Sequence, residues 1–294
     1  MGQEMGKENR PAEVGLRPGH TATLAAVGRA IHAATDKPKL LEDHLALGLA
    51  GDTGATLLAE LTKQLPGDSR DTFGLLFAMR ARFVEDAVDV AVKDGIGQYV
   101  ILGAGLDSFA YRRPDLEQRL KIFEVDRAEA QAWKRLRLGE MGVVIPPAVS
   151  FVPLDHETDD LRQSLVDAGF DLSAPAIVSA MALIQYLALP ASERMLSLVG
   201  TFPAGTRLVM TYVVPTTELT ELESAGLQWT MSQAEARGEP FLSLFGPQEM
   251  DDLIRRNGFR RVDHLGPHEL RALYLSGRPE VQIPGIERLA VAFV

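Results

Sequence analysis

Short apolar runs separated by helical stretches constrain the fold of this chain more than any other feature. Five of these runs are apolar almost throughout instead of alternating, which is typical of parallel strands covered on both faces. The runs span residues 98–103, 121–126, 149–155, 175–181 and 206–214, with helical stretches at about 127–140, 157–169 and 190–201 between them. This order predicts an α/β protein with a doubly wound parallel sheet.

Two further apolar runs extend the sheet beyond its fifth strand. They span 259–265 and 288–294 and follow a helix at about 247–257. A plain dinucleotide-binding fold closes on a helix, whereas here a strand comes last. We therefore expect a Rossmann-like, seven-stranded, mostly parallel sheet with an antiparallel last strand.

The sequence before the first strand is helical. Residues 1–15 are polar, contain Gly and Pro and show no periodicity, which predicts a mobile tail. Apolar spacing predicts helices over 21–34, 38–51 and 71–93, the second closed by Gly51. These helices form the N-terminal cap of the expected fold.

The chain shows no internal repeat and no second domain boundary. We expect one domain over 16–294, with a helical cap at 16–94, a cofactor-binding sheet at 95–294 and a helical insertion on the substrate side at about 214–246. Four large apolar residues in this insertion have a spacing that favours a core role over a substrate wall: Trp229, Met231, Phe241 and Phe245.

Composition narrows the class of partner. The net charge of −10 argues against nucleic acid or an anionic membrane surface. No stretch approaches the roughly 18 apolar residues of a membrane span, and the first residues have no apolar signal core. The chain has no cysteine, which removes disulfides, thiolate metal sites and cysteine nucleophiles. We expect a cytoplasmic protein without a metal, with a small-molecule substrate and a homo-oligomer left open.

The stretch "YVILGAGLDSFAYR" at 99–112 places two close glycines directly after the first strand. In an open parallel sheet, ligands bind beyond the carboxyl ends of the strands. A bare turn without a ligand is one interpretation of Gly103 and Gly105. A dinucleotide site would need a third glycine at position 108, which is Ser108, so the spacing favours a nucleoside without phosphates.

Two carboxylates at neighbouring strand ends sharpen this interpretation. Asp126 ends the second strand, 21 residues after Gly105, where a carboxylate can accept the hydroxyls of a ribose. Asp155 ends the third strand, where an adenine edge would lie. Either residue alone could cap a helix or a turn. Together with the glycine turn they predict a nucleoside-binding rim.

Four blocks then resemble the leucine carboxyl methyltransferase-like family of S-adenosylmethionine-dependent methyltransferases. They are "RARFVEDAV" (80–88), "VILGAGLDSFAYR" (100–112), "FEVD" (123–126) and "VPLD" (152–155), and weaker similarity extends over about residues 20–294. The bacterial members that include polyketide O-methyltransferases are the most similar subset. The resemblance implies a class I methyltransferase fold with an N-terminal helical lid and S-adenosylmethionine as cofactor.

The resemblance also assigns cofactor-binding roles. Arg80 matches an arginine that pairs with the carboxylate of the cofactor's methionine part, which suits a guanidinium. Gly103 and Gly105 match the turn under the methionine and ribose, and Asp126 matches the ribose-binding acid. Asp155 and His156 stand where the family has an Asp-Leu pair beside the adenine, so His156 is a departure.

A second departure lies after the fourth strand. The family commonly reads "AEGLLMYL" where this chain has "AMALIQYL" (180–187), so Met181 replaces a glutamate that helps to hold the cofactor's amino group. The loss implies weaker cofactor binding, another acceptor elsewhere, or a site remodelled for an apolar substrate. Met181 and Tyr212, at the ends of strands four and five, are the candidate substrate contacts.

The reaction expected from the resemblance is O-methylation of a small hydrophobic natural product. Methyl transfer from a sulfonium needs positioning and exclusion of water, and an acidic acceptor needs no strong base. No catalytic residue is assigned. Among the histidines, His20 precedes the lid helix and is the least improbable base, while His32 and His44 are expected on helix surfaces.

Three rival functions remain at this point. An NAD-dependent oxidoreductase is disfavoured by Ser108 and by the final strand. A non-methylating cyclase or isomerase, or a scaffold that binds the cofactor structurally, is kept open by Met181. Methylation of a protein terminus, as in eukaryotic relatives, is the third.

Overall fold

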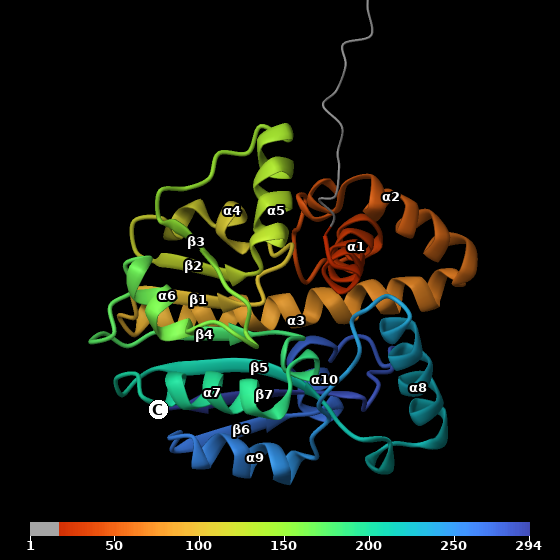
Figure 1. Cartoon of the computed structure of the whole chain (residues 1–294). Coiled ribbons are helices and arrows are strands. Elements are labelled where there is room, and N and C mark those ends of the chain that lie inside the picture. The colour runs from red at the N-terminus through yellow and green to blue at the C-terminus, as the bar shows by residue number, and fades with distance from the viewer. Residues whose placement is uncertain (1–17) are drawn as a thin grey trace, which may run out of the picture.

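A computed structural model describes residues 18–294 (Figure 1). The tail expected at 1–15 lies outside these residues. The strands are β1 Gln98–Leu102, β2 Lys121–Asp126, β3 Val149–Pro153, β4 Ile177–Ala180, β5 Arg207–Val213, β6 Arg261–Leu265 and β7 Glu287–Phe293. The α-helices are α1 His20–Thr35, α2 Ala46–Gln64, α3 Gly67–Lys93, α4 Phe109–Arg112, α5 Ala128–Glu140, α6 Leu161–Asp167, α7 Leu189–Gly200, α8 Glu221–Glu235, α9 Pro247–Arg256 and α10 Pro267–Tyr274.

The strands form one mixed sheet in the order β3-β2-β1-β4-β5-β7-β6. The first five strands are parallel, and β7 inserts antiparallel between β5 and β6. The pairing of β7 joins Val213 of β5 to Glu287 and Leu265 of β6 to Leu289. The predicted seven-stranded sheet with an antiparallel last strand is therefore confirmed.

Helices cover both faces of the sheet, which is why its parallel strands are largely apolar. Helices α6, α7 and α9 pack on one face, where Leu196 and Leu253 join Met210 in a single core. Helix α3 packs on the opposite face, where Val88 lies with Ile101. Burying each such side chain contributes roughly 1.5–3 kcal/mol.

The N-terminal helices lie at the side of the sheet toward which β1 and β2 point (Figure 1). The predicted break at Gly51 is confirmed, but the predicted range of this helix is wrong. Helix α2 begins at Ala46 instead of position 38 and continues to Gln64 as two helical segments, which meet at a kink where Gly51 is non-helical with a φ of 61°. A Cβ at this glycine would lie 3.1 Å from a ring carbon of Trp133 in α5. The glycine therefore ends the first segment of α2 and also allows a close contact with α5.

The expectation that His32 lies on a helix surface is also wrong. The side chain is fully buried, and its Nε2 accepts hydrogen bonds from the Leu40 and Leu41 amides at 2.9 and 3.3 Å. Burial lowers the pKa of His32, so the neutral ring acts as an acceptor. His44 is exposed, although it lies before α2 and not within a helix.

Within residues 18–294, no helix combines the length and the apolar character needed to cross a membrane.

Candidate active site

A cavity of about 680 Å³ opens at the carboxyl ends of the parallel strands. Its floor is the turn after β1, and its sides are the ends of β2, β3 and β4. Helices α1 and α3 and the segment 238–242 complete the wall. The cavity brings together seven of the eight site residues expected from the sequence: Arg80, Gly103, Gly105, Asp126, Asp155, His156 and Met181.

The glycine turn adopts a backbone that favours glycine. Gly103 and Gly105 have φ of 67° and 44°, in the left-handed region. A Cβ at Gly103 would lie 3.1 Å from Leu183, and a Cβ at Gly105 would lie 3.1 Å from Ala22 of α1. The turn is thus held closely between the segment after β4 and the first helix of the cap.

The carboxylate of Asp126 is fixed at the end of β2. One oxygen accepts the amide of Gly105 and the other accepts the amide of Arg127, at 2.5 and 2.7 Å. This bonding holds the carboxylate against the glycine turn.

Asp155 and His156 follow β3 on the same side of the cavity. Asp155 forms a local turn by accepting the Glu157 amide at 2.9 Å, and Arg127 lies 4.0 Å from its carboxylate. Burial lowers the pKa of His156, so its imidazole is neutral near pH 7. The Nε2 atom of His156 is buried and has no hydrogen-bond partner among the described residues.

Arg80 lines the cavity from α3. Its Nη1 donates to both carboxylate oxygens of Glu287, the first residue of β7, at 2.9 and 3.0 Å. The guanidinium carbon lies 4.3 Å from the centroid of the Phe77 ring. The ion pair and the aromatic ring therefore orient the guanidinium at the cavity wall.

Met181 and Ala182 form the wall at the end of β4. Met181 packs against the apolar cluster under α3. Ala182 has a φ of 50°, which costs a non-glycine residue free energy. The hydroxyl of Thr211 accepts the Ala182 amide at 2.7 Å and helps to hold this conformation.

The structure does not bring Tyr212 to the cavity. Side chains alternate between the faces of a strand, and Tyr212 lies with Leu208 and Met210 on the face covered by α7 and α9. Its hydroxyl lies 2.9 Å from Nδ1 of His264. The expected substrate contact is therefore corrected to a buried core residue.

His20 and the insertion also differ from expectation. The described cavity lining includes Gly19 and Thr21 but not His20, whose pKa is lowered by burial. In the insertion, Phe245 is buried as expected, whereas Trp229 in α8 is 67% exposed and belongs neither to the core nor to the cavity wall.

One polar contact over the cavity could not be predicted from the sequence. Glu239 accepts the His20 and Thr21 amides at 2.9 and 3.0 Å, and also the Thr21 hydroxyl. The Thr21 hydroxyl lies 3.1 Å from that of Tyr186, which follows β4. A carboxylate at a helix N-terminus is stabilising. Glu239 thus fastens the start of α1 over the cavity, and no local sequence signal marks a contact across 218 residues.

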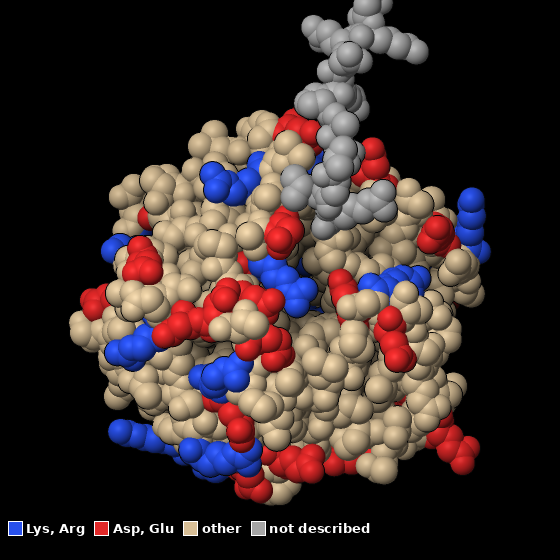
Figure 2. All heavy atoms as spheres, viewed as in Figure 1, with Lys and Arg blue, Asp and Glu red and all other residues tan. Residues whose placement is uncertain are grey.

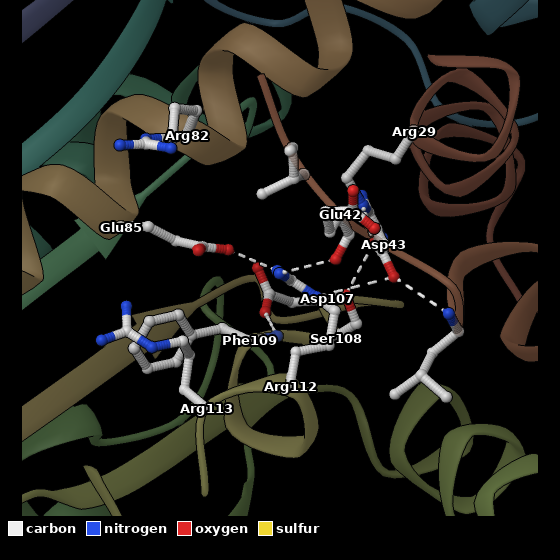
Figure 3. Close-up of polar contacts among 12 residues, drawn as sticks. Arg29, Glu42, Asp43, Arg82, Glu85, Asp107, Ser108, Phe109, Arg112 and Arg113 are labelled. Carbon is white, nitrogen blue, oxygen red and sulfur yellow. Dashed lines mark hydrogen bonds and ion pairs between the residues drawn. The ribbon is translucent and has the colours of Figure 1, made fainter. Parts of the chain in front are cut away.

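A second polar network joins the cap to the glycine turn (Figure 3). The fully buried carboxylate of Asp43 accepts Arg29 Nε at 2.8 Å and the Ser108 hydroxyl at 2.6 Å. Arg29 also donates to the Leu106 carbonyl at 2.7 Å, and Arg112 donates to the Ser108 hydroxyl at 2.9 Å. The serine that breaks the dinucleotide pattern therefore ties the turn to the cap.

Charges within this network shift two acids in opposite directions. Burial acts to raise the pKa of Asp43, but the guanidiniums of Arg29 and Arg112 outweigh it, and the pKa lies below its ordinary value. Burial raises the pKa of Glu85 even though Arg112 pairs with it. The network holds Asp43 ionised under the glycine turn.

The sheet order and the cavity define the class of protein. Two solved structures share this fold over nearly their whole length. One, from Thermobifida fusca and provisionally titled a methyltransferase, has a TM-score of 0.56 at 17% identity and covers 95% of this chain and 96% of its own. The other, a DUF574 family protein from Streptomyces avermitilis, has a TM-score of 0.58 at 15% identity, with 94% and 97% covered. The fold is of the class I methyltransferase type.

The model of the leucine carboxyl methyltransferase family matches residues 22–200, which is more than half of the chain. The chain therefore belongs to the leucine carboxyl methyltransferase family, and the family resemblance read from the sequence is confirmed.

Individual relatives agree with the family. The Bacillus subtilis protein YktD is 28% identical over 281 residues, which is 88% of this chain and 92% of YktD. A Mycobacterium avium protein is 37% identical over 58% of this chain and 55% of its own length. Their names class both provisionally as S-adenosyl-L-methionine-dependent methyltransferases. The cofactor of this group is S-adenosylmethionine, as expected from the sequence.

Proposed function

We propose that the chain transfers a methyl group from S-adenosylmethionine to an oxygen atom of a small hydrophobic molecule, in the manner of the bacterial polyketide O-methyltransferases. The observation that carries the proposal is the apolar wall at the end of β4. Met181, Leu183 and Leu187 line the cavity there, together with Phe77 and Leu242. An apolar scaffold of a substrate would bury its surface against these side chains.

The cavity residues fit the cofactor. The glycine turn lines the cavity floor without side chains, Asp126 would accept the ribose hydroxyls with its fixed carboxylate, and Asp155 and His156 would lie beside the adenine. Arg80 would hold the carboxylate of the methionine part. The bound cofactor would supply an electrophilic methyl group, and the chain would position the acceptor and exclude water.

The acceptor we favour is a carboxylate or an acidic phenol. The described cavity lining contains no lysine and a single histidine, His156, at the adenine end. The carboxylate of Glu239 already accepts the amides that begin α1. An acceptor that ionises near neutral pH needs no strong general base, so it suits such a lining.

We also propose a small molecule, and not nucleic acid, as the partner. Basic side chains on the face drawn in Figure 2 are interspersed with acidic ones, and the described residues there form no continuous basic surface. The net charge of −10 agrees with this proposal.

Calorimetry and a methyl-transfer assay together test the function. We expect S-adenosylhomocysteine to bind and NAD not to bind. Labelled methyl groups should then pass to apolar aromatic acids or phenols, and not to a peptide ending in a leucine carboxylate.

Each contrary outcome identifies another function. Binding without transfer to any acceptor would favour the non-methylating enzyme or scaffold that Met181 keeps open. Transfer to the peptide alone would favour methylation of a protein terminus. Binding of NAD in place of S-adenosylhomocysteine would favour an oxidoreductase.

A further inference from the structure

The loss of a glutamate at position 181 raises the question of what holds the cofactor's ammonium group. The inference here rests on the proposed function. The amino acid end of the cofactor carries a carboxylate, for which Arg80 is available, and an ammonium group, which needs an acceptor. Burying an ammonium group without a partner is costly, so another oxygen of the cavity must replace the missing glutamate.

The cavity is rich in carboxylates, but most of them already have partners. Seven carboxylates and three guanidiniums line it, which favours a ligand with a positive charge. Asp126 accepts two backbone amides, and Glu239 accepts the amides that begin α1. Glu85 pairs with the guanidinium of Arg112. Each of these three acids therefore already has a partner within the protein.

Asp107 differs from these acids. It lies two residues after Gly105, and one carboxylate oxygen accepts the Phe109 amide at 2.7 Å, which fixes the side chain in a local turn. The other oxygen has no hydrogen-bond or ion-pair partner among the described residues. Asp107 thus lines the cavity with a side chain fixed by one oxygen and with a second oxygen that has no partner among the described residues.

Asp107 and Met181 line the same cavity. Burial raises the pKa of Tyr99 and of Glu85, and the charge of Asp107 adds to both shifts, so Asp107 lies in the neighbourhood of both lining residues. Met181 packs against the apolar cluster that contains Tyr99. Figure 3 shows Asp107 beside Glu85 and Ser108, under the cap.

We propose that Asp107 accepts the ammonium group of the cofactor, in place of the glutamate that Met181 replaces. The negative charge at this end of the cavity is kept, but it comes from the glycine turn instead of the end of β4. Position 181 is then free to contact an apolar substrate.

Binding measurements on an isosteric variant test the proposal. We expect Asp107→Asn to weaken S-adenosylhomocysteine binding about 10- to 100-fold, because a charge-assisted hydrogen bond is lost. The side-chain oxygen of Asn can still accept the Phe109 amide, so the turn should be retained. Binding of 5′-methylthioadenosine, which lacks the amino acid end, should not change.

A rescue and a matched control complete the design. Met181→Glu in the Asp107→Asn background should recover most of the lost affinity. Asp171→Asn is the control, because Asp171 forms the same local turn by accepting the Ser173 amide at 2.8 Å and lies outside the cavity lining. This control should bind both ligands normally.

Three outcomes would overturn the proposal. Unchanged S-adenosylhomocysteine affinity would show that Asp107 makes no such contact. Equal losses for both ligands, or no rescue by Met181→Glu, would show that Asp107 only shapes the turn. Failure of the unaltered protein to bind either ligand would instead overturn the proposed function, and this inference with it.

Discussion

Ala182 keeps a left-handed backbone at the wall of the cavity, with a φ of 50°. Glycine adopts this conformation without the steric cost of a Cβ. We predict that Ala182→Gly raises the free energy of unfolding by about 1 kcal/mol, measured by chemical denaturation. Ala180→Gly, in the strand β4, is the control and should lower it. A fall at both positions would contradict the assignment of strain to Ala182.

For single residues, the sequence predicted location in the cavity where that location follows from a position at the end of a strand. Gly105 and Asp126 follow apolar runs, so strand ends alone placed them in the cavity. Tyr212 was misplaced because its position along β5 is readable, whereas the face to which it points depends on the register of the strand. Glu239 was missed because its partners lie 218 residues away.

Helix α1 forms part of the cavity wall, and the stability of its first turn depends on contacts with other elements. We predict that Glu239→Ala lowers the free energy of unfolding by about 1 kcal/mol, because two amides at the start of α1 lose their acceptor. Hydrogen exchange should accelerate in residues 20–24. Glu235→Ala changes an exposed residue of α8 and should leave this exchange unaltered. Equal exchange in both variants would contradict the proposed role of Glu239 in holding the start of α1.

The link between the cap and the glycine turn should depend on pH. The pKa of Asp43 is lowered on folding, so its contribution to stability is present above its unfolded value of about 3.9 and is lost as the pH falls through the folded value. We predict that Asp43→Asn costs about 3 kcal/mol at pH 7, because Arg29 and Arg112 lose a buried partner. Urea denaturation should show this difference narrowing toward pH 3. A difference independent of pH would contradict the prediction.

Elements were predicted well where burial is uniform and poorly where packing decides a boundary. The five parallel strands were located because both faces of the sheet are covered there, so each of these strands is a nearly continuous apolar run, whereas β6 is a partly exposed edge strand with charged residues. The helical segment of α2 after Gly51 was not predicted, since a glycine that ends a helix and a glycine at a kink between two helical segments look the same in sequence.

The cap and the sheet share the walls of one cavity, so the chain should unfold as a unit. Trp133 in α5 donates to the Leu49 carbonyl of α2 at 2.9 Å and reports on this contact. We predict a single transition, with Trp133 fluorescence and far-ultraviolet circular dichroism giving the same midpoint in a Trp229→Phe variant. S-adenosylhomocysteine at 100 times its dissociation constant should raise the free energy of unfolding measured by both probes by about 2.7 kcal/mol. Two separate midpoints would contradict the single domain.

The insertion of β7 between β5 and β6 has a consequence for synthesis of the chain on the ribosome. During translation β6 leaves the exit tunnel before β7, and the strand pairings of β6 are with β7 alone among the described residues. Until β7 emerges, the nascent sheet can therefore contain only the strands up to β5, and β6 has no strand to pair with. Arg80 likewise has its partner Glu287 only after β7 has emerged, so the part of the cavity wall formed by Arg80 is completed late.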